Sequence, residues 1–143
     1  MTVRKELVIQ KISQADKSLT DARDILKLSD SEILGNIINL SALERYFQLT
    51  VDAILGANNH IIKETNLKTA DDLQSTFSIL SDGGVLPKEF AEKIAPVVGL
   101  RNLIIHQYEK VDNRKFLEDF RKHNSDFDEY FRQILSYLDK ANL

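Results

Sequence analysis

The sequence predicts an all-α fold: an antiparallel bundle of four to five helices in a single domain spanning residues 1–143. Apolar residues recur at steps of three and four along most of the chain, which is the spacing of one helix face. Only five glycines and two prolines interrupt the 143 residues. No segment shows the alternation of apolar and polar residues that marks a half-buried strand. A chain of this length can bury a core without disulfides or a metal ion.

The first helix is expected over about residues 3–28. A second is expected to begin after Ser29, Asp30 and Ser31, whose side chains are favourable N-caps. It should run unbroken to about residue 65, with Gly56 as its one weak interior point. The apolar residues that predict the two helices are Val8, Ile12, Ala15, Leu19, Ala22, Leu26, Ile33, Ile37, Ile38, Leu43, Phe47, Val51, Ile54, Leu55 and Ile61.

The segment between residues 66 and 96 is expected to hold two short helices, in an arrangement that the sequence leaves open. Residues 69–72 offer caps for the first helix, and Gly83 with Gly84 would end it. Pro87 suits the first turn of the second helix. Pro96 removes a backbone donor, so it predicts a kink or a restart.

A helix is expected from near Pro96 to His106, followed by a last helix with an aromatic seam. The seam is predicted by Phe116, Phe120, His123, Phe127, Tyr130, Ile134 and Tyr137. Asn124 and Ser125 are expected to interrupt this helix, with Ser125 as a new N-cap.

Composition excludes several classes of protein. The chain has no cysteine, which rules out a disulfide scaffold and a thiolate zinc site. No His, Asp or Glu group shows metal-ligand spacing, so neither a metal ion nor another cofactor is expected. No apolar run approaches a membrane span and no signal region is evident, which predicts a cytoplasmic protein with no membrane partner. The net charge of −3 means that any RNA contact must come from a local patch.

Residues 101–108 hold the most distinctive chemistry of the chain. Arg101 supplies a permanent positive charge on a planar group that fits phosphate oxygens, and His106 carries protons near neutral pH. Tyr108 adds a phenol two residues further on. This combination is suited to chemistry on a phosphodiester.

The pattern of an arginine, four residues, a histidine, one residue and a tyrosine resembles the signature of the HepT family of HEPN-domain ribonuclease toxins. Arg101, His106 and Tyr108 occupy the three signature positions. Residues 77–82 and 86–90 are similar to the family's usual approach to that motif, and the long second helix and the aromatic last helix fit as well. The resemblance therefore covers most of the chain.

The resemblance implies a HEPN-like dimeric helical bundle with the active site in a cleft at the subunit interface. It implies a metal-independent RNA endonuclease that is neutralised by an MNT-type nucleotidyltransferase antitoxin, which adenylylates the motif tyrosine. Arg101 and His106 then become the catalytic pair, Asn102 a supporting residue and Tyr108 the modification site. The RNA target is open between messenger and transfer RNA, since the sequence has no base-reading motif.

The spacing between Arg101 and His106 bears on whether the protein acts as a homodimer. Five residues of an ideal helix turn through about 500°, which leaves Arg101 and His106 about 140° apart in projection. Either the helix unwinds near His106, or a second copy completes the site across a two-fold axis. A homodimer would also supply two histidines, one as base and one as acid.

Two other sets of polar residues allow two interpretations each, and two histidines remain beside them. Lys110, Arg114 and Lys115 are candidates for RNA-backbone contacts, but acidic residues are interleaved with them, as on a solvated helix face. Glu44, Gln48 and Asp52 recur every four residues; they are first interpreted as a polar face, and alternatively as the border of the cleft. The remaining histidines are expected to be structural, His60 as a C-terminal cap and His123 as a packed or half-exposed residue of the seam.

Two alternatives to a nuclease remain from the sequence. One is a non-catalytic HEPN module that binds nucleotide or RNA and partners a nucleotidyltransferase. The other is a structural helical adaptor in which the motif is incidental.

Overall fold

The computed structural model describes residues 4–141, which form eight α-helices and one 3-10 turn, with no strand among them. The helices are α1 (Lys5–Leu26), α2 (Asp30–Leu34), α3 (Ile37–Glu64), α4 (Ser75–Asp82), α5 (Lys88–Ile94), α6 (Val97–His106), α7 (Asn113–His123) and α8 (Ser125–Ala141), with the 3-10 turn η1 (Tyr108–Lys110) between α6 and α7. Residue 3, where the first helix was expected to begin, lies outside the described range.

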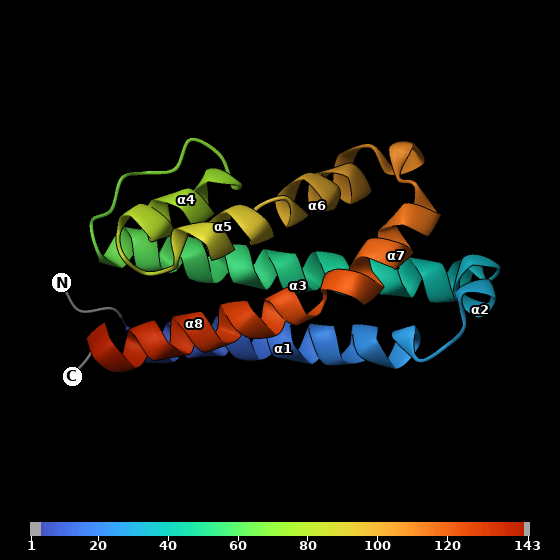
Figure 1. Cartoon of the computed structure of the whole chain (residues 1–143), viewed down its shortest axis with the longest axis horizontal. Coiled ribbons are helices and arrows are strands. Elements are labelled where there is room, and N and C mark those ends of the chain that lie inside the picture. The colour runs from blue at the N-terminus through green and yellow to red at the C-terminus, as the bar shows by residue number, and fades with distance from the viewer. Residues whose placement is uncertain (1–3, 142–143) are drawn as a thin grey trace.

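The helices are arranged in four antiparallel passes (Figure 1). Helix α1 runs in one direction, and α3 returns beside it after the short α2. The pair α5 and α6 runs back along α3, and α7 with α8 completes the bundle. The predicted all-α antiparallel bundle is confirmed, with its passes broken into shorter helices.

The expectation of one unbroken helix from Ser29 to residue 65 is wrong. Ser29 does cap a helix, through a capping box in which its hydroxyl accepts from the Glu32 N–H, but that helix ends after one and a half turns. Gly35 then follows, where a Cβ atom would lie 2.7 Å from a backbone oxygen of Ser31. The Asn36 side chain accepts from two N–H groups of the next turn and so begins α3 as a separate helix.

The turn after α4 depends on glycine. Gly84 has φ of +79°, a conformation that side chains disfavour. The N–H of Val85 bonds to the carbonyl of Leu80 at 2.8 Å, and the N–H of Gly84 bonds to that of Ser81 at 3.0 Å, as in a Schellman motif. The predicted glycine stop is therefore confirmed.

Both prolines lie at helix starts, but Pro87, which was expected in the first turn of its helix, is the N-cap residue before it. Pro87 directly precedes the first residue of α5. Pro96 separates α5 from α6, so the chain restarts there as a new helix that runs to His106. The interruption near Asn124 is also present, but Ser125 is the first residue of α8 and not its N-cap. The Asn124 side chain instead donates to the carbonyl of Phe120 at the end of α7.

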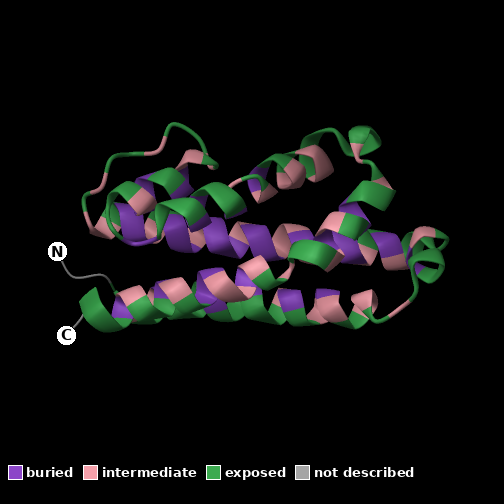
Figure 2. Ribbon diagram, in the orientation of Figure 1, coloured by how far each residue is buried: buried purple, intermediate pink, exposed green. Residues whose placement is uncertain are grey.

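The core lies along α3, which is buried on its inward face over its whole length (Figure 2). Phe47 of α3 is at the centre of an aromatic cluster, with ring centroids 5.5 Å from Phe116, 5.4 Å from Phe120 and 6.2 Å from Phe127. The aromatic seam is thus confirmed for these phenylalanines. His123 is not packed among them, because its side chain is 51% exposed and faces Asp126.

His60 lies in the last turns of α3, as expected, but its Nε2 contacts the Glu64 carboxylate rather than a terminal carbonyl group. His60 therefore pairs with a side chain of its own helix, and the expected C-terminal cap is not present within the described residues.

Replacing Phe47 with alanine is expected to lower the free energy of unfolding by about 3–5 kcal/mol, because it leaves a cavity at the centre of the aromatic cluster. Urea denaturation followed by circular dichroism would measure the change. Ile38→Ala is the matched control, since Ile38 is 76% exposed and its truncation should change stability by less than about 0.5 kcal/mol. Equal losses in the two variants would contradict the assigned core.

Candidate functional site

Helix α6 presents both Arg101 and His106 to one hollow in the surface of about 560 Å³. The helix continues through His106 and ends at Gln107, whose φ of −141° and ψ of 52° are not helical. The backbone therefore does not unwind before His106, and the two side chains keep their helical offset. Both side chains nevertheless line the same hollow, so completion of the site by a second copy stays a prediction.

Arg101 is held in place by two acceptors. Its Nε donates to Oδ1 of Asp52 at 2.7 Å, and its Nη1 donates to Oδ1 of Asn102 at 3.0 Å. Its side chain is 18% exposed, against 34% for Asp52. A guanidinium has five N–H donors, so the donors that have no partner within residues 4–141 can bind a phosphate in a fixed orientation.

Asn102 lies between the other two motif residues. In helical projection it is about 100° from Arg101 and about 40° from His106. Its amide oxygen orients the guanidinium, and it lines the same hollow as both. This position fits the supporting role that was predicted for it.

His106 is the last residue of α6 and is exposed. Within residues 4–141 the imidazole has no hydrogen-bond partner or ion pair. An unengaged histidine at the rim of a hollow can take or give a proton to a ligand bound there.

Tyr108 begins η1 and is 47% exposed, but its hydroxyl points to a buried carboxyl group. The hydroxyl donates to Oε1 of Glu44 at 2.8 Å. Glu44 is only 2% exposed, and burial raises the pKa of its carboxyl group above the usual value, although the Tyr108 hydrogen bond opposes this. The same hydrogen bond raises the pKa of the Tyr108 phenol.

One face of α3 therefore anchors both ends of the motif. Asp52 holds Arg101, Glu44 holds Tyr108, and Gln48 between them reaches Asp52 at 3.5 Å. The first interpretation, a polar face, is incomplete, because Glu44 and Asp52 contact the motif. None of the three residues lines the hollow of Arg101 and His106, so the alternative that they border the cleft stays a prediction. The signal in the sequence was a glutamate placed between core positions Leu43 and Phe47, where a solvated face would not lie.

The basic residues after the motif do not line its hollow. Lys110 and Lys115 border a second, mainly apolar hollow of about 560 Å³ between α6 and α7. Lys115 pairs with Asp119 at 3.5 Å, whereas Arg114 is exposed. Their contact with RNA stays a prediction.

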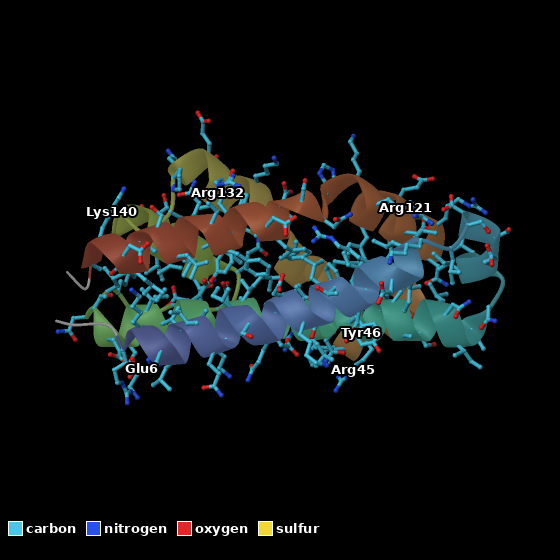
Figure 3. The ribbon with its side chains drawn as sticks, turned by 90° about the horizontal axis from the view of Figure 1, so that it is seen from below. Glu6, Arg45, Tyr46, Arg121, Arg132 and Lys140 are labelled. Carbon is cyan, nitrogen blue, oxygen red and sulfur yellow. The ribbon has the colours of Figure 1, made fainter. Side chains whose placement is uncertain are left out.

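Arg121, another basic residue of this stretch, has a structural role. Its guanidinium donates to the carbonyls of Leu26 and Leu28 at 2.6 and 2.8 Å and to Oδ1 of Asp30 at 2.8 Å. It thereby ties α7 to the C-terminal end of α1, near the end of the bundle occupied by α2 (Figure 3).

Within the described residues, no three His, Cys, Asp or Glu side chains are grouped closely enough to hold a metal ion. In the same range, no helix has the length and apolar character needed to cross a bilayer.

The fold and the site together define a class of protein, a helical bundle that presents an Arg-x4-His-x-Tyr motif on α6 and the following turn η1. The family model described as "Ribonuclease HepT-like" matches residues 15–134, which is most of the chain. The protein belongs to the HepT-like ribonuclease family.

Known proteins similar to this chain agree with that assignment. The tRNA nuclease HepT of Aphanizomenon flos-aquae is 32% identical over 95 residues, which cover 66% of this chain and 65%, just under two thirds, of that relative. The mRNA nuclease HepT of Shewanella oneidensis is 21% identical over 126 residues, which cover 88% of this chain and 86% of the relative. Both the predicted family and its enzyme class, ribonuclease, are confirmed.

A solved structure of a tri-AMPylated Shewanella oneidensis HEPN toxin in complex with MNT antitoxin is similar in fold. Its TM-score is 0.83 at 17% sequence identity, with 90% of this chain and 96% of that chain covered. The HEPN-like fold is thereby confirmed.

Glu44→Gln is expected to change how stability depends on pH. Because burial raises the Glu44 pKa in the folded state, the carboxyl group contributes stability at low pH that is lost as pH rises from its unfolded value of 4.5 through the folded pKa. As pH rises, the free energy of unfolding of Glu44→Gln should therefore increase relative to that of the wild type. Urea denaturation across about pH 4 to 8 would measure it.

Asp16→Asn is the control for this measurement, because Asp16 is exposed on α1. It should show no comparable trend. A Glu44→Gln difference that is constant with pH would contradict the raised pKa.

Proposed function

We propose that the protein is a metal-independent RNA endonuclease toxin that works as a homodimer. The observation that carries the proposal is the placement of an oriented arginine, Arg101, and an unengaged histidine, His106, on one hollow of a HepT-like chain. The two similar nucleases are named for transfer RNA and messenger RNA, so the proposed substrate is RNA.

The proposed reaction uses the RNA's own 2′-hydroxyl. Its oxygen attacks the adjacent phosphorus while its proton passes to His106, and Arg101 stabilises the negative charge that grows on the non-bridging oxygens. The bond from phosphorus to the 5′ oxygen then breaks, and that oxygen takes a proton from an acid. The products are a 2′,3′-cyclic phosphate and a 5′-hydroxyl.

The need for both a base and an acid supports the homodimer. One chain contributes a single motif histidine, and a two-fold axis near α6 would bring a second one to the same phosphate. The exposure of apolar residues on α6, such as Ile105 at 36%, is consistent with a partner surface there. Lys110, Arg114 and Lys115 are proposed to contact the RNA backbone outside the reaction centre.

We further propose that an MNT-type nucleotidyltransferase antitoxin neutralises the enzyme by adenylylating Tyr108. The half-exposed phenol is two residues from His106 and is reachable from solvent. An adenylyl group there would add a bulky anion beside the site that must admit an RNA phosphate. The similar Shewanella toxin was solved in AMPylated form with an MNT antitoxin.

Purified protein is expected to cleave RNA in the presence of EDTA and to sediment as a dimer. His106→Ala and Arg101→Ala should each lower the rate by a factor on the order of 10²–10⁴, since one removes the proton carrier and the other the charge stabilisation. Gel analysis of labelled RNA would measure the rates, and circular dichroism would verify folding.

His60→Ala is the matched control for the nuclease test, because this histidine lies in the last turns of α3 beside Glu64 and lines neither the motif hollow nor the hollow of Lys110 and Lys115. It should keep the wild-type rate. Equal absence of cleavage in wild type and His106→Ala would exclude the nuclease and leave the non-catalytic HEPN module. A fully active monomer in analytical ultracentrifugation would exclude the composite site.

Tyr108→Phe is expected to keep ribonuclease activity but to escape neutralisation, because it removes the oxygen that accepts the adenylyl group. Cell survival on co-expression with the antitoxin would report neutralisation. Rescue of cells that carry Tyr108→Phe to the wild-type level would contradict the assigned modification site.

A further inference from the structure

Glu44 is a buried carboxyl group that no cation neutralises within the described residues. It is 2% exposed, and its Oε2 atom is buried without a hydrogen-bond partner. Arg45, the next residue in the chain, is exposed and projects outward from α3 (Figure 3). Burying a carboxyl group without a counter-ion destabilises a fold, so its presence here calls for a functional reason.

The one polar contact of Glu44 is with the proposed modification site. Its Oε1 accepts from the Tyr108 hydroxyl at 2.8 Å, which is within the range for direct proton transfer. The Glu44 carboxyl group is buried next to the phenol, whereas Tyr108 itself is 47% exposed. Tyr108 is therefore partly exposed at the surface while its hydroxyl proton is directed to Glu44.

Other tyrosines lack this arrangement. All four tyrosines of the chain lie in the described range, and Tyr108 alone donates its hydroxyl proton to a carboxylate. Tyr130 is fully buried, and its hydroxyl contacts the amide oxygen of Asn58 at 2.5 Å. Among residues 4–141, no carboxylate accepts from the hydroxyl of Tyr46 or Tyr137. The carboxyl partner thus distinguishes Tyr108 from the rest.

We propose that Glu44 is a catalytic residue of the adenylylation of Tyr108, so that the toxin itself supplies the base for its own modification. This inference rests on the proposed function, because it assumes that a nucleotidyltransferase delivers a nucleoside triphosphate to Tyr108. The phenolic oxygen attacks the α-phosphorus, and its proton passes to Oε1 of Glu44. The bond between the α-phosphorus and the oxygen that bridges it to the β-phosphorus breaks, and pyrophosphate leaves with the electron pair of that bond.

Burial makes Glu44 suitable for this step. A carboxyl group whose pKa is raised by desolvation is a stronger base than an exposed glutamate when it is ionised. When Glu44 takes the phenolic proton, its buried negative charge is neutralised. The transfer therefore removes an unpaired buried charge, which favours the step.

The test is the rate at which an MNT-type antitoxin adenylylates the chain with ATP and Mg²⁺, followed by intact-protein mass spectrometry. Glu44→Gln keeps an acceptor oxygen for the hydroxyl but cannot take its proton, so the rate should fall at least tenfold and by up to about 10⁴-fold. Glu6→Gln, the same change at an exposed position of α1 labelled in Figure 3, should keep the wild-type rate. Tyr108→Phe gives the background of the assay.

Glu44→Ala provides a second measurement that is independent of the glutamine variant's folding. Added formate should restore its modification rate by acting as a small carboxylate in the vacated space, and chloride should not. A slow rate that formate leaves unchanged would show that Glu44 acts only through structure and would overturn the catalytic role.

The outcomes separate this inference from the proposed function. Wild type that is modified while Glu44→Gln is slow supports the inference. Equal rates in wild type and Glu44→Gln overturn it and leave the proposed toxin and its antitoxin intact. Wild type that is never modified overturns the proposed neutralisation, and the inference with it, whereas RNA cleavage by the same preparation still tests the nuclease.

Discussion

The attachment of α6 and η1 to one face of α3 is the constraint on which the motif's geometry depends. Asp52 and Glu44 are eight residues apart on α3, which separates them by about 12 Å along the helix axis. The antiparallel course of α6 allows Arg101 to meet Asp52 and Tyr108 to meet Glu44 without distortion (Figure 1). Because partly exposed ion pairs contribute only about 0–1 kcal/mol, the Arg101–Asp52 contact orients the motif more than it stabilises the fold.

Stability comes from other parts of the bundle. The aromatic cluster around Phe47 and the buried faces of α1 and α8 form the core, whereas Val98 is the only residue of α6 that is buried. Much of α6 is exposed or half-buried in the single chain (Figure 2). Stability and the orientation of the motif therefore depend on different parts of the bundle. Helix α3 contributes to both, because one of its faces packs in the core and another contacts the motif.

The helices and the motif could be predicted from the sequence because both are local. The spacing of apolar residues defined α1, and Pro96 marked the start of the motif helix. The break before α3 was missed because Ile37 and Ile38 continue the apolar pattern, yet they are 67% and 76% exposed. Periodicity alone could not show that the Asn36 side chain starts a new helix there.

The supports of the site could not be predicted because they are tertiary. Glu44 and Tyr108 are 64 residues apart, and Arg101 and Asp52 are 49 apart, so no spacing rule within one helix connects them. The four-residue repeat of the polar residues indicated only that they share a face of α3. Which side chains meet that face depends on how α6 packs, and α6 is placed by Pro96 and the hydrophobic contacts of the bundle.

The position of Glu44 also bears on how the proposed modification would silence the enzyme. An adenylylated Tyr108 has no hydroxyl proton to donate, so the hydrogen bond that holds η1 to α3 is lost. In its place, a phosphodiester anion lies next to the buried Glu44 carboxyl group. Once Glu44 releases the proton that it took in the transfer, two negative charges would share the site, which disfavours that position of the adenylylated side chain. Since His106 is two residues away at the end of α6, displacement of Tyr108 would also move the histidine relative to Arg101, which Asp52 still holds. The proposed modification would then disrupt the catalytic geometry in addition to blocking access to RNA.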